Sequence, residues 1–419
     1  MARIMARIIS RLCFIQRLPA ASMLAVSLLA AGLTAPACSP APSQTSDTTN
    51  RSTGLASSTN TSKAAKPAPP PPPPPPLTPE SFVVDKQAWT LDAAPGQIIS
   101  TLNFKLYTTS DKSFIVDNIP AFLETAFSHY STSLGPLPRP TAPMEIYLLA
   151  TRGQWERQTQ RFMGDSAGTY LQIQKGGFTY DGRALLYDIG MRDTFAITAH
   201  EGWHVYTQST FKNSLPVYLE EGLATYMEGF RWDTQNVVTP TFFPWANFER
   251  FGALRSASRN QRLMPLSKIT VSTPQQLIGN DSDLALAYYA QVWALIHFLN
   301  EGEGGIHAVN LRRLVSDAAS GRLVPTIRKA LGDRAASIYA YRRRGVDLLK
   351  LYFDKTPDEL DAAYQAFILV VVQTGTRQDI WRGRSPIVTP APATAPPMTK
   401  SGQGPDTAAR EVVQASPAR

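Results

Sequence analysis

The sequence predicts an α+β fold, with a mixed N-terminal lobe that includes one chemically distinctive helix and a helical C-terminal lobe. Three observations lead to this prediction. Short alternating or apolar runs, typical of strands, occur in the first half of the chain. Long periodic patterns typical of helices fill nearly everything after Thr194. The two ends have compositions that cannot bury enough apolar surface to fold.

Residues 1–38 have the layout of a secretory signal. Arginines come first, an uncharged apolar run from Leu18 to Leu33 follows, and small residues lead to Cys38. The segment before Cys38 resembles a bacterial lipoprotein cleavage site, and the only other cysteine, Cys13, lies inside the presequence. We therefore expect export to the cell envelope and membrane attachment through a lipid on Cys38. An uncleaved anchor and a freely secreted form are the alternatives.

Two segments of biased composition flank an expected folded domain at 82–384. Residues 39–81 are rich in Ser, Thr, Asn, Ala and Pro, and the run from Pro69 to Pro76 favours a stiff polyproline II spacer. Residues 385–419 are rich in Pro, Ala and Thr without periodic apolar positions, so we expect a disordered tail. The spacer would hold one domain away from a membrane.

The first half of this domain mixes the periodicities of strands and helices. Gln97 to Tyr107 alternates like a half-buried strand, and Met144 to Leu149 and Ala184 to Tyr187 are short apolar runs typical of strands. Pro120 to Leu134 and Arg152 to Phe162 have helical patterns. This mixture predicts the N-terminal lobe.

Helices dominate the second half. The first is expected to start with Asp193 or Thr194 as its N-cap. The later helical patterns cover Pro216 to Phe230, Asp283 to Leu299, Ala335 to Tyr352 and Pro357 to Val372. The residues that could carry chemistry lie where the two lobes join, a common place for a site.

The chain is basic, with a net charge of +8 and a pI near 9.4. Such a balance raises nucleic acid as a possible partner, but an export signal argues against it. We therefore expect no nucleic acid partner and a basic surface that faces anionic lipid or cell-wall polymer.

The sequence His200-Glu201-Gly202-Trp203-His204 contains an HExxH pattern within an expected helix. This spacing puts both imidazoles on one helix face, about one turn apart, where they can bind one tetrahedral ion. Glu201 would point toward the open position of that ion. We therefore expect a Zn²⁺ site with His200 and His204 as ligands and Glu201 as general base; the rival interpretation is an ordinary amphipathic helix face.

A catalytic zinc ion typically has a third protein ligand besides water. Pro216 suits the first turn of a helix, and the segment after it contains Glu220 and Glu221, far enough from His204 for an antiparallel helix to return beside the histidines. Spacing alone leaves both glutamates open as the ligand. Glu228 follows on the same helix face as Glu221 and could orient a ligand histidine.

The two motifs together resemble the gluzincin metallopeptidases, the superfamily of thermolysin and aminopeptidase N. The chain is most similar to bacterial proteins that pair HEGWH with EGLATY, here beginning at Glu221. The resemblance implies that Glu221 is the third ligand. The segment from Tyr288 to Leu295 is similar to the helix on which aminopeptidase N relatives keep a catalytic tyrosine, which implies this role for Tyr289. The matching motifs cover about residues 140–300.

The chain departs from the aminopeptidase pattern in one respect. Those enzymes carry a Gly-x-Met-x-Asn segment that captures the substrate's amino terminus, and nothing between Asp165 and Thr194 provides it. Exopeptidase specificity is therefore not expected. The run from Phe178 to Tyr187 is instead the candidate edge strand along which such enzymes pair an extended peptide.

The expected mechanism is peptide hydrolysis by metal-activated water. Zinc lowers the pKa of its bound water to about 7, and Glu201 would take up the proton and deliver it to the leaving amine. The oxyanion needs a second donor, for which Tyr289 is our first choice and Tyr288 and His297 are the alternatives. Tyr289 also fits an ordinary core aromatic, because it lies on an apolar stripe at helical spacing.

The sequence thus predicts a zinc-dependent peptidase of the cell envelope that acts on a peptide or protein substrate. The alternative is an envelope lipoprotein that binds zinc without hydrolysis and serves a binding or assembly role. The presence of Glu201 argues against it, because binding zinc requires no base there. A third hypothesis is a structural envelope protein that works through its basic surface and proline spacer.

Overall fold

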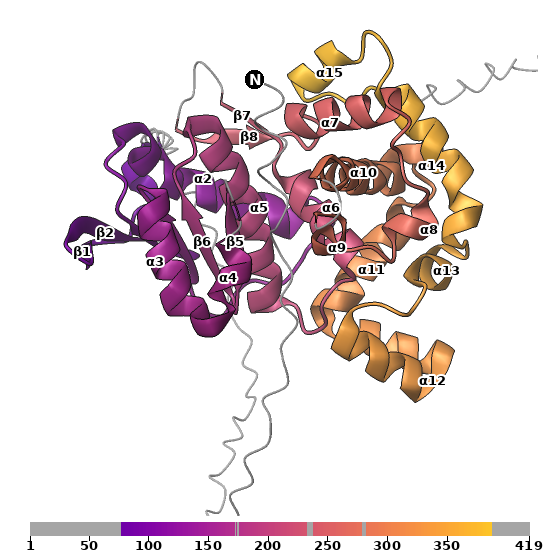
Figure 1. Cartoon of the computed structure of the whole chain (residues 1–419), viewed down its shortest axis with the longest axis horizontal. Helices are drawn as coiled ribbons and strands as arrows, with labels where there is room; N and C mark the ends of the chain where they lie inside the picture. The colour runs from indigo at the N-terminus through magenta and orange to yellow at the C-terminus, as the bar shows by residue number, and fades with distance from the viewer. Residues whose placement is uncertain (1–76, 172, 174–175, 233–237, 279–281, 388–419) are drawn as a thin grey trace, which may run out of the picture.

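The computed structural model describes residues 77–171, 173, 176–232, 238–278 and 282–387. The predicted signal with Cys38, nearly all of the predicted spacer and the predicted tail beyond residue 387 lie outside the described residues. Among the described helices, none is both long and apolar enough to cross a bilayer. The predicted α+β class is confirmed, with a sheet-containing lobe beside a helical lobe (Figure 1).

A six-stranded mixed sheet forms the centre of the N-terminal lobe, in the order β1-β2-β3-β4-β6-β5. Strands β3, β4 and β6 run parallel, whereas β1, β2 and β5 pair antiparallel with their neighbours. Buried side chains recur at every second residue of β3, as expected where one face of a sheet is covered. The strands are β1 (Asp85–Leu91), β2 (Ala94–Ser100), β3 (Phe104–Thr108), β4 (Met144–Leu149), β5 (Gly177–Tyr180) and β6 (Arg183–Tyr187).

Helices pack on this sheet, and one of them carries the HExxH residues. That helix, α5, lies against β4, β5 and β6 and also contacts α2. Its middle is buried on all sides, from Phe195 to Thr207 with only Ala196 partly exposed. The helical segments of this lobe are η1 (Pro79–Phe82), α2 (Ser113–Thr132), α3 (Arg152–Met163), η2 (Gly164–Ser166), α4 (Ala167–Tyr170) and α5 (Met191–Thr210).

The C-terminal lobe is helical and is organised around α10, which contacts α6, α7, α9, α11 and α14. Every residue of α10 from Ala287 to Leu299 is buried. The C-terminal lobe is accompanied by a small hairpin, β7 (Phe230–Trp232) and β8 (Pro240–Phe242), which packs on α2 of the N-terminal lobe and which the sequence patterns did not predict. Its helices are α6 (Val217–Met227), α7 (Phe248–Arg259), α8 (Leu266–Ile269), α9 (Pro274–Ile278), α10 (Ser282–Glu301), η3 (Gly302–Gly305), α11 (Ala308–Ser320), α12 (Leu323–Arg342), α13 (Leu348–Phe353), α14 (Pro357–Val371) and α15 (Arg377–Arg382).

The strand character predicted from Gln97 to Tyr107 is present, but one continuous strand is wrong, because the segment consists of the end of β2 and most of β3 with a turn at 101–103 between them. Glu124 of α2 accounts for the break. Its carboxylate accepts hydrogen bonds from the Thr101 hydroxyl at 2.5 Å and from the Asn103 backbone N–H at 2.7 Å. The second bond satisfies the Asn103 backbone N–H, which in a continuous strand would have donated to a neighbouring strand.

Two helix predictions also need correction. Helix α5 begins at Met191 with Gly190 as N-cap, not at Asp193 or Thr194, and the Thr194 hydroxyl instead accepts a bond from the Ile189 N–H at 3.1 Å. The helix predicted from Ala335 to Tyr352 is divided into α12 and α13, with a left-handed residue at Arg343 between them.

Candidate metal centre

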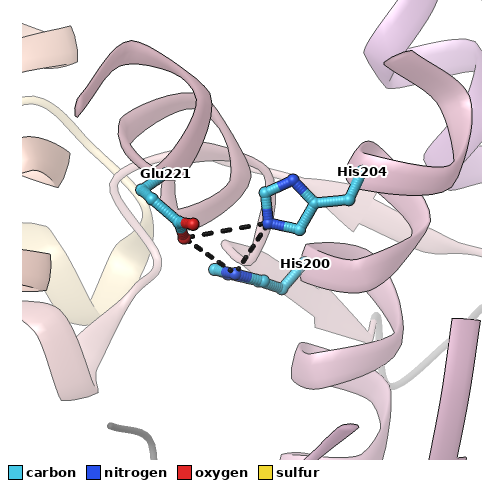
Figure 2. A group of neighbouring side chains, drawn as sticks. All are labelled: His200, His204 and Glu221. Carbon is cyan, nitrogen blue, oxygen red and sulfur yellow. Dashed lines mark hydrogen bonds and ion pairs between the residues drawn. The ribbon is translucent and has the colours of Figure 1, made fainter. Parts of the chain in front are cut away.

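Helices α5 and α6 bring three ligand atoms to one point, as Figure 2 shows. The Nε2 atoms of His200 and His204 lie 3.2 Å apart. Glu221 Oε2 lies 3.6 Å from the first and 3.8 Å from the second. The three side chains are only 1–2 % exposed. Ligand atoms about 2 Å from one tetrahedral zinc ion lie a little over 3 Å from each other, so these separations fit that coordination.

The approach of α6 to this point follows from its burial and from one small residue. All residues of α6 are buried. At Gly222, directly after the candidate ligand Glu221, an added Cβ would lie 2.8 Å from the carbonyl oxygen of Val292 on α10. Glycine therefore allows α6 to pack closely between α5 and α10, with Glu221 facing the histidines.

The ring nitrogen of His200 that faces away from the centre is held by Glu228. Its Nδ1 lies 2.7 Å from Glu228 Oε1, a contact that fixes the orientation of the ring. Arg250 donates to both carboxylate oxygens of Glu228, at 2.7 and 3.0 Å, and the Asn247 amide donates to Oε2 at 2.7 Å. The carboxylate is therefore fixed on all sides.

Glu220, which spacing alone left open as a ligand, faces the other histidine from outside the centre. Its Oε1 lies 3.0 Å from His204 Nδ1 and accepts a hydrogen bond from the Thr207 hydroxyl at 2.7 Å. The adjacent glutamates thus take different positions: Glu221 lies at the convergence point, and Glu220 orients His204. This role of Glu220 was not predicted.

The donor set fits a small divalent cation. The Nδ1 atoms of His200 and His204 face Glu228 and Glu220, so with the ring protons on Nδ1 the two Nε2 lone pairs would face each other across 3.2 Å. A carboxylate oxygen faces the same point. Lone pairs and a negative charge that converge in a buried space repel one another unless a cation lies between them.

The ionisation of Glu228 and Glu221 is consistent with a cation at this centre. Burial alone would raise the pKa of Glu228, but the Arg250 guanidinium and the contact with His200 outweigh it and lower that pKa to about 2. Burial likewise opposes ionisation of Glu221, yet hydrogen bonds and positive charge from the His200 and His204 rings, when a proton rather than a metal ion lies on their Nε2 side, hold its pKa below the ordinary value. Both glutamates are therefore carboxylates at neutral pH.

Glu201 lies beside the centre without being one of its three candidate ligands. Its Oε2 accepts a hydrogen bond from the Thr179 hydroxyl on β5 at 2.7 Å. The residue is fully buried, and desolvation raises the pKa of its carboxyl despite the opposing effect of the two histidines. A carboxylate with a raised pKa accepts a proton more readily than an ordinary glutamate.

Tyr289 lies next to the centre on α10. Its ring centroid is 6.3 Å from that of His200, and the Arg250 guanidinium lies over it at 5.3 Å from the ring centroid. Tyr288 is also buried, and burial and the charge of Glu221 raise the pKa of its phenol well above the usual value. Both tyrosines are therefore close to the ligands.

His297, the remaining alternative for the oxyanion donor, belongs to another cluster. Its ring stacks on Trp245 with centroids 3.6 Å apart, and its Nδ1 lies 3.0 Å from Glu301 Oε1. Eight residues of helix separate it from Tyr289, which corresponds to about 12 Å along the axis. The structure therefore does not bring His297 to the centre.

The sequence did not predict three residues that position the glutamates of the site. Arg250 and Asn247 donate hydrogen bonds to Glu228, and Thr179 donates one to Glu201. No local spacing relates them to the HExxH residues. Asn247 did carry one signal, since it is the N-cap of α7 and its side chain accepts from the Arg250 N–H. That signal predicts a helix start but not a contact with Glu228.

No protein-family profile matches the chain, and neither a curated protein nor a solved structure matches it significantly. Fold and site together define an α+β protein with a buried group of His200, His204 and Glu221 that could hold a metal ion.

Proposed function

We propose that this protein is a zinc-dependent peptidase of the gluzincin type that hydrolyses peptide bonds by metal-activated water. The observation that carries the proposal is the position of Glu201. A buried carboxyl with a raised pKa lies one residue from a metal-binding histidine, and a hydroxyl on the edge strand of the sheet fixes it. A site that only stores a metal has no use for such a group.

Each side chain has a distinct part in this mechanism. Zinc bound by His200, His204 and Glu221 would supply a Lewis acid and lower the pKa of water to near 7. Glu201 accepts a proton from the attacking water and later delivers it to the leaving amine. Tyr289 donates its phenol to the oxyanion that develops on the substrate.

The position of the edge strand β5 beside Glu201 supports an extended peptide as the substrate class. Strand β5 is the edge of the six-stranded sheet and pairs with β6 on one side. Thr179 of β5 donates to Glu201, so a peptide that adds to this edge passes the general base. The signal and Cys38 extend the proposal to a cell-envelope enzyme attached to the membrane by a lipid, without a nucleic acid partner.

One observation favours the second candidate, a metal-binding envelope lipoprotein that does not hydrolyse. The three candidate ligands are almost completely buried. A buried centre restricts access of a peptide carbonyl, whereas it suits a metal with a structural role. Metal content and hydrolysis must therefore be measured together.

The test uses the full chain, its Glu201→Gln variant and its His200→Ala variant. We expect about one zinc per chain in the first two and none in the third. New termini in a peptide mixture, detected by mass spectrometry, should appear only with the unmutated chain and disappear with a chelator, because an amide cannot accept the proton of water.

The outcomes separate the candidates. Zinc without hydrolysis in the unmutated chain would favour the lipoprotein that only binds metal. Absence of metal after reconstitution would refute both candidates, and hydrolysis retained in Glu201→Gln would exclude Glu201 as the base.

A further inference from the structure

A pocket of about 250 Å³ lies at the junction of α5, β7, α7 and α15 and contains none of the candidate metal ligands. Aromatic residues from four separate segments form half of its lining, which also includes Arg192 and Arg231, and we call it the aromatic pocket. The aromatic residues are Phe195, Phe230, Trp232, Phe248 and Trp381, with Ile380 beside them.

The aromatic pocket has a buried floor and an open rim. Phe195 and Ile380 are fully buried, whereas Trp381 is 51 % exposed. The rim is nevertheless held in place. The Trp381 ring packs edge-on against Phe248 with centroids 5.9 Å apart, and its carbonyl oxygen accepts a hydrogen bond from Arg231 at 2.8 Å.

An exposed tryptophan that is held by its neighbours is typical of a recognition surface. Large aromatic side chains gain most by burial against a partner, and fixing them beforehand lowers the entropy cost of binding. Grooves lined by aromatic rings are the usual receptors for proline-rich segments in the polyproline II conformation. The aromatic rings of the pocket therefore favour a proline-rich occupant, and Arg192 and Arg231 in its lining disfavour a positively charged one.

The chain itself supplies such a segment close by. Residues 388–398 read Val-Thr-Pro-Ala-Pro-Ala-Thr-Ala-Pro-Pro-Met and contain no charged side chain. The last described residue, Ile387, follows Trp381 by six positions, so it lies within about 20 Å of it. In polyproline II the segment spans about 30 Å, which is enough to cross the pocket.

The other proline-rich segment is less well placed. The run from Pro69 to Pro76 continues through Leu77 into η1, which packs against α2. The C-terminal segment is instead separated by five residues from α15, which is itself a wall of the pocket. Attachment this close gives a high effective concentration, so even weak contacts hold the segment.

We propose that residues 388–398 dock in the aromatic pocket of their own chain as a polyproline II segment that packs against Trp232, Phe248 and Trp381. The occupied pocket is a second binding site, separate from the metal centre. The proposal does not depend on peptidase activity.

The first test is photo-crosslinking in the full chain that carries Trp381→p-benzoylphenylalanine. Mass spectrometry after irradiation should find crosslinks to residues 388–398 within one chain. Tyr341→p-benzoylphenylalanine is the matched control, because Tyr341 is 58 % exposed on α12 and does not line the pocket. Crosslinks to residues 69–76, crosslinks to a second isotope-labelled copy, or a yield no higher than the control would each overturn the proposal.

The second test changes the tail and leaves the pocket intact. Combined Pro390→Ala, Pro392→Ala, Pro396→Ala and Pro397→Ala substitutions keep the length and neutrality of the segment but remove its polyproline preference. We expect the crosslink yield at Trp381→p-benzoylphenylalanine to fall at least tenfold, with faster hydrogen exchange in 377–383. Unchanged yield and exchange would refute the docking.

Discussion

Two glutamates contact the imidazoles of the candidate metal centre at Nδ1, the ring nitrogen that faces away from the centre. Glu228 contacts His200 and Glu220 contacts His204. A carboxylate on Nδ1 fixes the tautomer and ring orientation and makes Nε2 a better ligand. Arg250 in turn fixes Glu228 and lies over the Tyr289 ring. A single buried arginine therefore connects the candidate ligand His200, through Glu228, to the proposed oxyanion donor Tyr289.

Tyr289→Phe is the sharpest test at the residue scale. The phenol stabilises charge that exists only in the transition state, so its loss should lower kcat about a hundredfold to a thousandfold and change KM little. Steady-state kinetics on a peptide substrate, identified by the digestion described above, would measure this. The substitution keeps the ring and its stacking with Arg250.

Tyr288→Phe, measured in parallel, is the matched variant on the same helix. Its hydroxyl has a weak contact with the Ser272 carbonyl oxygen at 3.5 Å, so we expect a small effect. A deep loss in Tyr288→Phe together with full activity in Tyr289→Phe would transfer the donor role to Tyr288. Full activity in both variants would leave Tyr289 as a core aromatic.

Local spacing explains which site residues could be predicted. The four-residue repeat places His200 and His204 on one face of any helix, and Glu228 follows Glu221 at helical spacing, so one sequence is enough to relate each pair. Arg250 contacts the site only because α7 packs against α10, and Thr179 only because β5 packs against α5. Contacts of this kind depend on tertiary structure, which residue spacing does not encode.

At the scale of elements, the metal centre depends on how closely α6 packs against α10. Gly222→Ala would place a methyl group 2.8 Å from the Val292 carbonyl oxygen and 2.9 Å from Ile296 Cγ1. Overpacking of this kind costs about 1–3 kcal/mol. We expect lower stability in urea and weaker zinc binding, because Glu221 moves with its helix.

Gly252→Ala is the matched control for this prediction. Gly252 lies within α7, and an added Cβ would meet nothing within 4 Å. Alanine in a helix interior is more favourable than glycine by roughly 0.5–1 kcal/mol, so this variant should be slightly more stable. Equal stabilities for the two variants would contradict the close packing of α6 on α10.

The elements predicted best were those with one uninterrupted pattern. Met144 to Leu149 is a strand over the predicted range, and the helix predicted from Arg152 extends to Met163. The errors occurred where a partner interrupts the pattern. Glu124 caps the turn inside the predicted strand, and a left-handed Arg343 ends α12 although the helical periodicity continues beyond it.

At the scale of the whole molecule, His129 couples stability to pH. It stacks on Phe242 with centroids 5.1 Å apart, and its Nε2 is buried without a hydrogen-bond partner among the described residues. Burial lowers its pKa to about 4 from an ordinary value of 6.5. The unfolded chain therefore binds more protons between these values, and stability should fall as pH drops from 6.5 to 4.

His129→Phe keeps the stacked ring and removes the titration. As pH drops from 6.5 to 4, the unmutated chain should lose at most about 3 kcal/mol of unfolding free energy relative to this variant. Denaturant unfolding at several pH values measures it, and effects common to both proteins cancel. A constant difference would show that His129 titrates equally in both states.

Metal removal should affect the whole molecule, because the candidate ligands join α5 of the N-terminal lobe to α6 of the C-terminal lobe. An ion that binds only the folded state stabilises it by about 4 kcal/mol when its free concentration is a thousand times the Kd. For a domain of this size, each kcal/mol shifts Tm by roughly 2–4 °C. A chelator should therefore lower Tm by on the order of 10 °C.

His204→Ala separates this linkage from other effects of the chelator. Without its ligand the variant should already melt at a lower temperature, and chelator should not change its Tm. A chelator shift of equal size in both proteins would show that the stabilising ion binds elsewhere. A shift confined to the unmutated chain would instead assign the ion to the junction of the lobes, where loss of one ligand loosens both α5 and α6.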